Sequence, residues 1–135
     1  HNGLHAIAWC IEHNLIQQAV TLIQEVAITW LCQQFSLRYF NQKDRELVNQ
    51  AFNILAQPNR KELQTNKKAV MLSSEELLRQ FHPVYNSMRN LRNSINHGGY
   101  TDRIEAGKFY DTIKNAYQNL KTLIEKYENP GASDQ

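Results

Sequence analysis

Helix-breaking residues are scarce in this 135-residue chain, which contains only five glycines and three prolines. Between them the apolar side chains recur every three or four positions, as on one face of an α-helix, and not at every second position as in a half-buried strand. The sequence therefore predicts an all-α fold. The apolar pattern predicts five main helices, at residues 2–13, 15–35, 44–58, 73–98 and 102–127.

Two sequence pairs have the spacing of a capping box, in which a side chain before the helix and one in its first turn satisfy free backbone N–H groups. Ser73 with Glu76 predicts the start of the fourth helix, and Asp102 with Glu105 predicts the start of the last one. Pro83 lacks a backbone N–H group and is expected to kink or split the fourth helix.

The second predicted helix is apolar over more of its circumference than a surface helix needs, so we expect it to be central or to lie in an interface. Asp44 is expected to open the third helix, and the polar residues 59–72 to form a connection with at most a short helical turn. A hydrophobic content of 41% is enough for one core,. We predict one domain over residues 1–128 and a flexible tail over 129–135.

The formal net charge of +2 permits an RNA partner without indicating one by itself,. Cys10 and Cys32 lie among apolar residues, where a free thiol is usually a small buried hydrophobe, so we predict a reducing, cytoplasmic location. No charged leader opens the chain, and no apolar run reaches the roughly 20 residues that a bilayer requires. We expect no membrane association.

The densest group of chemically capable side chains is the run RNSINHGG at residues 92–99, near the end of the fourth predicted helix. At about 100° per residue, Arg92, Asn93, Asn96 and His97 form one polar arc beside the apolar stripe. An arginine can hold a phosphate with two parallel hydrogen bonds, and a histidine can move a proton near neutral pH. These are the tools for cutting RNA without a metal. The arc is also consistent with an ordinary helix end, where a cationic histidine complements the helix dipole.

One copy of the chain supplies one imidazole, whereas acid-base cleavage of RNA needs a proton removed from the 2′-hydroxyl and a proton delivered to the leaving 5′-oxygen. A two-fold dimer that joins two copies of this helix end would bring two His97 and two Arg92 side chains into one cleft. We therefore expect a homodimer. Asn96 and Tyr100 are the candidate RNA contacts, Tyr100 by stacking on a base.

We predict no metal ligands and no cofactor. His1 and His5 are one helical turn apart, with Cys10 and His13 nearby, but they lack the tight paired spacing of zinc sites. The glycines at 98 and 99 end a helix and do not open one after a strand, so they do not form a phosphate-cradling loop.

The motif formed by Arg92, Asn93 and, after three further residues, His97 resembles the Arg-polar-His motif of the HEPN superfamily, in which it lies on the penultimate helix of an all-α domain. A second stretch, LHAIAWCIEHNLIQQAVTLIQE at residues 4–25, is similar to the opening of the HEPN domain in CRISPR-associated CARF-HEPN proteins of type III systems. Together the two regions extend the resemblance over most of residues 2–127.

The resemblance implies a metal-independent endoribonuclease of antiviral defence that dimerises through this domain and cleaves single-stranded RNA to leave a 2′,3′-cyclic phosphate. It assigns phosphate binding to Arg92, assistance of the 2′-hydroxyl to His97 and shaping of the site to Asn93. It also implies a CARF sensor for cyclic oligoadenylate in an N-terminal part that precedes His1. The isolated piece is expected to be weakly active.

Two other interpretations stay open. The chain could be a binding module, a HEPN domain that pairs with a nucleotidyltransferase or another partner in a toxin-antitoxin system. It could also be a structural dimerisation domain whose polar arc is only solvated surface, which the broadly apolar second helix favours. The separation of the two His97 residues across a two-fold axis distinguishes the last interpretation from the nuclease.

Overall fold

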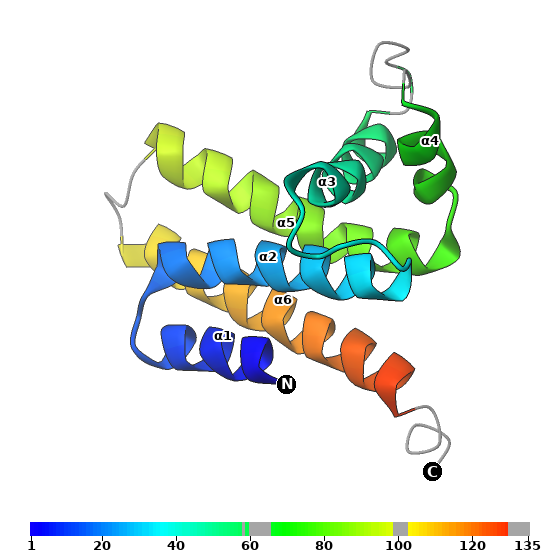
Figure 1. The fold of residues 1–135 in the computed structure, drawn as a ribbon. Helices are drawn as coiled ribbons and strands as arrows, with labels where there is room; N and C mark the ends of the chain where they lie inside the picture. The colour runs from blue at the N-terminus through cyan, green and yellow to red at the C-terminus, as the bar shows by residue number, and fades with distance from the viewer. Residues whose placement is uncertain (58, 60–65, 99–102, 130–135) are drawn as a thin grey trace. The chain divides into compact units, whose positions relative to one another are not determined.

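The computed structural model describes residues 1–57, 59, 66–98 and 103–129, without the side chains at 97, 98 and 103–106. These residues form helices only, so the prediction of an all-α fold is confirmed (Figure 1). The helices are α1 (Asn2–Glu12), α2 (Ile16–Gln34), α3 (Gln42–Ala56), α4 (Lys67–Ser73), α5 (Glu76–Gly98) and α6 (Arg103–Glu128).

The chain groups into two compact units. One unit comprises His1–Val26 and Ser87–Gln135, and the other comprises Ala27–Asn86. The first unit, called the terminal unit below, contains α1, α6, the first part of α2 and the last part of α5. The second, the middle unit, contains α3, α4 and the remaining parts of α2 and α5. One domain over residues 1–128 stays a prediction, and most of the predicted tail lies outside the described residues.

In the terminal unit α1 packs against α6 (Figure 1). The approach of α1 to α2 is close at Gly3, where an added Cβ atom would lie 2.7 Å from Cγ2 of Val26. A glycine is therefore required here because a side chain would push the two helices apart. The apolar side chains buried in this unit come from all four helical segments and include Leu4, Ile7, Ile23, Met88, Ile113, Leu120 and Ile124.

The turn from α1 to α2 is set by Asn14, whose φ of 59° lies in the left-handed region. The N–H group of Asn14 donates to the Ile11 carbonyl at 3.2 Å, and that of Leu15 donates to the Cys10 carbonyl at 2.8 Å. This is the Schellman arrangement, which satisfies the last carbonyl groups of a helix, and asparagine tolerates its backbone angles better than most residues. The expected break at Asn14 is confirmed.

The core of the middle unit is built around stacked aromatic side chains. The rings of Trp30 and Phe81 lie 5.0 Å apart between centroids, and those of Phe52 and Tyr85 lie 4.3 Å apart. The Tyr85 hydroxyl donates a hydrogen bond to Oδ1 of Asn49. These contacts join α2, α3 and α5 within the unit, and the hydrogen bond satisfies the polar end of a buried tyrosine.

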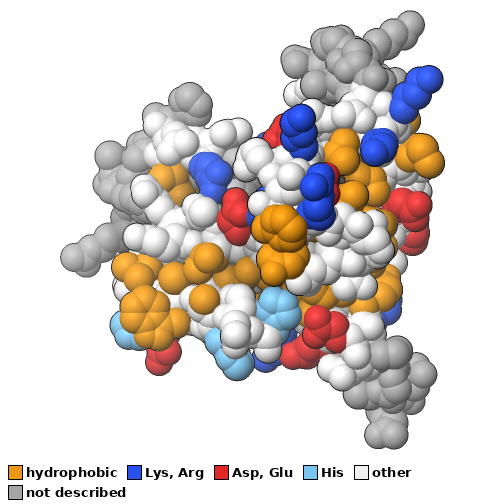
Figure 2. Space-filling model, viewed as in Figure 1, with side chains coloured by type: hydrophobic (Ala, Val, Ile, Leu, Met, Phe, Trp, Pro, Cys, Tyr) orange, Lys and Arg blue, Asp and Glu red, His pale blue; other side chains and the backbone are white. Residues whose placement is uncertain are grey.

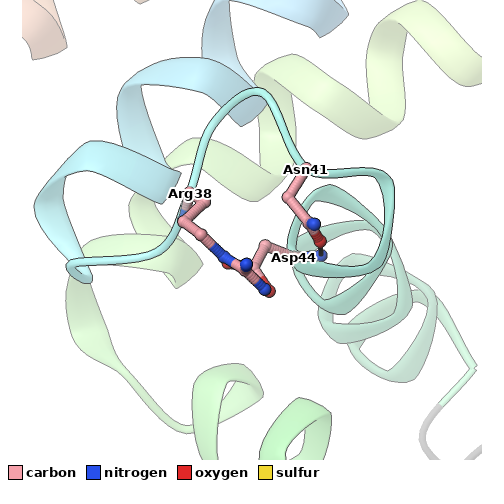
Figure 3. A network of polar contacts seen from close by, with 3 residues as sticks. All are labelled: Arg38, Asn41 and Asp44. Atoms are coloured by element: carbon pink, nitrogen blue, oxygen red, sulfur yellow. Dashed lines mark hydrogen bonds and ion pairs between the residues drawn. The ribbon is translucent and has the colours of Figure 1, made fainter.

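The link from α2 to α3 is closed by Arg38, Asn41 and Asp44 (Figure 3). Oδ2 of Asp44 accepts from the Arg38 backbone N–H group at 2.7 Å and from its Nε at 3.2 Å. The Asn41 side chain accepts from the Asp44 N–H group at 3.1 Å, so Asn41 is the N-cap and the helix begins at Gln42. The prediction that Asp44 opens the helix was therefore wrong by one half-turn, because Asp44 occupies the third helical position.

The junction between α4 and α5 differs from the prediction. Ser73 ends α4, and its hydroxyl donates to the Val70 carbonyl at 2.6 Å. It does not start the next helix, which begins at Glu76. The residues predicted to be a polar connection, 59–72, contain all of α4 except its last residue, Ser73. The cap of α4 is Asn66, whose side chain accepts from the N–H groups of Lys68 and Ala69 at 3.0 and 3.3 Å. The described residues therefore contain six helices, where five main helices were predicted.

Pro83 lies inside α5 and does not split it. A proline removes one backbone donor from the helix interior, but its ring is exposed here, while the neighbouring Val84 is buried,. The apolar face of α5 is thus continuous across the proline. The last part of this helix carries the candidate site.

Trp9 is an aromatic residue of α1, yet its side chain is 54% exposed. Its ring instead stacks on His13, with 4.2 Å between the centroids. Apolar and histidine side chains lie next to each other over α1 (Figure 2). Cys10 and Cys32 are buried and free, as predicted, and burial raises the pKa of the Cys32 thiol. No helix in the described ranges is long and apolar enough to cross a membrane.

Candidate functional site

The polar arc predicted near the end of α5 lies in the terminal unit. Arg92, Asn93 and Asn96 are exposed, while Leu91 and Ile95 on the same stretch are buried. The helical period therefore placed these three polar side chains on the surface correctly. A helix of buried apolar and exposed polar positions holds such a set at fixed mutual spacing.

The other two predicted site residues are placed less completely. His97 lies within α5, one turn after Asn93, so its backbone position is that of the predicted arc. Its side chain is outside the described atoms, and Tyr100 is outside the described residues. The proposed roles of both residues stay predictions.

A hydrogen bond joins the Arg92 side chain, on α5, to α2. Its Nη2 donates a hydrogen bond of 2.9 Å to Oγ1 of Thr21, 71 residues away in the sequence. A guanidinium group has five N–H donors in a rigid plane, and this bond uses one of them. Thr21 thus restricts the orientation of a long, exposed side chain while leaving other donors for an anion.

Arg92 borders a small hollow of about 120 Å³ between α2 and α5. The residues that line it are Gln17, Val20, Thr21, Arg92, Ile95 and Asn96. Val20 and Ile95 are buried and form the apolar part of the lining. Among the described residues of this lining, Arg92 is the one that is charged, and none is a carboxylate. A site of this charge and size suits a small anionic group such as one phosphate, since pockets for whole ligands measure about 300–1,000 Å³.

Sequence reasoning did not find Gln17 and Thr21. Both face the hollow from α2, where they are one turn apart and exposed. A signal for them does exist in hindsight, because they are polar positions at helical spacing on a helix that is otherwise largely apolar. Nothing in the sequence, however, indicated that this polar edge meets Arg92.

The described residues of the site offer no metal-binding group. Across the described part of the chain, no three His, Cys, Asp or Glu residues are close enough together to hold a metal ion. Comparison with known proteins gives no independent assignment: no protein-family model, curated protein or solved structure matches the chain.

Proposed function

We propose that the chain is a HEPN-type endoribonuclease domain that cleaves single-stranded RNA without a metal ion, as part of type III CRISPR antiviral defence. The observation that supports this best is the position of Arg92, which Thr21 holds beside a hollow whose described lining residues carry one positive and no negative charge. A phosphodiester is an anionic group that such an arginine binds specifically, because two of its N–H groups match two phosphate oxygens.

The proposed reaction is transfer of the phosphate to the neighbouring 2′-oxygen. Arg92 binds the non-bridging oxygens and stabilises the charge that grows on them in the transition state. His97 removes the proton from the 2′-hydroxyl as the bond from O2′ to phosphorus forms and the bond from phosphorus to O5′ breaks. Asn93 shapes the site and Asn96 contacts the RNA. The products are a 2′,3′-cyclic phosphate and a 5′-hydroxyl.

A second acid must protonate the leaving O5′. In this proposal it is His97 of a second copy, in a homodimer formed through the HEPN helices. The proposal also includes a cytoplasmic location and control by cyclic oligoadenylate, bound by a sensor in a longer chain.

The test is cleavage of a labelled single-stranded RNA in the presence of EDTA. We expect His97→Ala and Arg92→Ala to lower the rate by about 10²–10⁴-fold, the range for loss of a general acid-base group. Asn90→Ala changes an exposed residue of the same helix that does not line the hollow, and it should cleave like the wild type. The proposal fails if His97→Ala cleaves as fast as the wild type, or if the wild type shows no cleavage at high protein concentration.

One observation favours a second function. The exposed Trp9 ring, stacked on His13, places one large aromatic side chain on the surface of α1, and tryptophan is enriched at protein interfaces,. A HEPN binding module of a toxin-antitoxin pair would use such a surface. A stable partner of a different chain type in a pull-down, combined with absence of nuclease activity, would support this function over the first.

A further inference from the structure

A larger cavity lies beside the hollow at Arg92. Its volume is about 620 Å³, and it is formed where the start of α2 faces α6, two segments that lie side by side in the terminal unit (Figure 1). Its lining residues are Asn14, Leu15, Ile16, Gln17, Gln18, Gly107 and Tyr110. Gln17 lines both spaces, so the larger cavity and the hollow at Arg92 are neighbours. The volume falls in the usual range for ligand pockets of about 300–1,000 Å³.

Gly107 has no evident structural reason to be a glycine. It lies inside α6, where glycine is less favourable than alanine because it loses more backbone freedom on folding,. A Cβ atom built at this position meets none of the described atoms within 4 Å, and the backbone there does not adopt a positive φ. Neither the described neighbours nor a positive φ requires the glycine, which leaves open space at the wall of the cavity.

The chemistry of the cavity complements that of the hollow. None of the seven described lining residues of the cavity is charged, whereas Arg92 gives the hollow a positive charge. Tyr110 offers a half-buried aromatic ring, and Gln17 and Gln18 offer carboxamides that can both donate and accept hydrogen bonds,. An uncharged, flat group with donors and acceptors at its edge fits this lining.

The ring of Tyr110 is also close to a positive charge. Nζ of Lys114 lies 5.3 Å from its centroid, a cation-π distance,. This contact restrains the ring and occupies one of its faces. A base would stack on the other face, while the lysine adds positive charge near the RNA backbone.

We propose that this cavity binds one nucleobase of the RNA, next to the phosphate held by Arg92. The base stacks on Tyr110 and its edge is bound by Gln17 or Gln18, while Gly107 keeps the space open. The two neighbouring spaces then accommodate the neutral and the anionic parts of one nucleotide. This inference rests on the proposed function, because the occupant is part of the RNA substrate.

The experiment measures binding of a fluorescein-labelled, 2′-O-methylated eight-nucleotide RNA by fluorescence anisotropy, since this RNA lacks the 2′-hydroxyl that cleavage requires. Tyr110→Ala should weaken binding by about 5- to 150-fold, the effect of losing one base-aromatic stack. Tyr110→Phe keeps the ring and should bind like the wild type.

The variant Gly107→Leu fills the cavity without destabilising the fold. Leucine is a much better helix former than glycine, so this variant should have a melting temperature at or above that of the wild type. Its side chain enters the cavity, and binding should weaken by at least about tenfold. The matched control is Asn119→Leu, an exposed position of α6 that does not line the cavity. It should leave binding unchanged.

The outcomes distinguish this inference from the proposed function. If the wild type cleaves RNA through His97 but Gly107→Leu and Tyr110→Ala both bind RNA as well as the wild type, the base cavity is refuted and the nuclease stands. If the wild type neither binds nor cleaves RNA, the proposed function fails and the base cavity fails with it. If Tyr110→Ala does not fold, RNA binding by Gly107→Leu decides the test.

Discussion

At the scale of single residues, the site depends on a contact between two exposed side chains. A free arginine on a helix surface has about 2 kcal/mol of rotamer entropy, part of which is lost when it binds an anion in one geometry. The hydrogen bond from Arg92 to Thr21 restricts the side chain before any ligand arrives. Thr21 is therefore a positioning residue for the guanidinium group.

Replacing Thr21 by valine should lower kcat/KM for RNA cleavage by about 2- to 12-fold, because one hydrogen bond of about 0.5–1.5 kcal/mol is lost while the shape of the side chain is kept. Thr21→Ser restores the acceptor and should restore activity. Thr122→Val, at an exposed position of α6, is the matched control. Full activity in Thr21→Val, or equal loss in Thr21→Ser, would contradict the positioning role.

At the scale of elements, the start of α3 depends on a carboxylate. The Asp44 carboxylate accepts hydrogen bonds from the backbone N–H group and from the guanidinium group of Arg38. Both contacts, the backbone one more strongly, lower the pKa of the Asp44 carboxyl below its usual range. A carboxylate in the first turn also complements the helix dipole. The contacts between Asp44 and Arg38 thus stabilise the link between α2 and α3 most while Asp44 is ionised.

A lowered folded-state pKa gives stability that is fully present above the unfolded pKa of about 3.9 and is lost as the pH falls through the folded value. Asp44→Asn should therefore unfold at a lower urea concentration than the wild type at pH 7, and the difference should shrink as the pH falls below about 3.9. The control is Glu46→Gln, which removes another carboxylate of α3 and leaves the contact between Asp44 and Arg38 intact. It shows how much of the effect comes from the loss of a negative charge alone. A difference that persists unchanged at low pH would contradict this account.

The helical period located most elements correctly from the sequence. The ends of α1 and α2 were predicted to within about two residues because each apolar stripe stops there,. In the structure, Asn14 and Ser36 have left-handed backbone just beyond these two ends. α4 was missed because seven residues are too few to show a period,. Ser73 was misassigned because its hydroxyl, which the capping box requires, binds a carbonyl of the preceding helix.

The candidate site was predicted in part, for the same physical reason. Spacing along one helix places Arg92, Asn93 and Asn96 on one surface, and this holds in the structure. Their neighbours Gln17 and Thr21 belong to another helix, so the meeting depends on how α2 and α5 pack. The periodicity of apolar residues within one helix does not predict which residues of another helix it contacts.

At the scale of the whole molecule, the proposed chemistry needs more than one chain. Each chain has one Arg92 and one His97, while the reaction needs two proton transfers at opposite sides of the phosphate,. A two-fold axis through the end of α5 would supply both histidines to one cleft. A dimer with one inactive chain would lose all cleavage activity if the site is shared, and half of it if each chain has its own site.

Mixing wild-type chains with His97→Ala chains at constant total concentration tests this difference. Random pairing at equal amounts makes about a quarter of the dimers fully wild type, so a shared site that needs both histidines should retain about a quarter of the activity. Independent sites should retain about half, because each wild-type chain keeps working. Mixing with the active Asn90→Ala chains is the control and should keep nearly full activity. Activity measured after exchange of subunits, with dimer formation checked by sedimentation, therefore decides whether Arg92 and His97 form half of a site or a whole one.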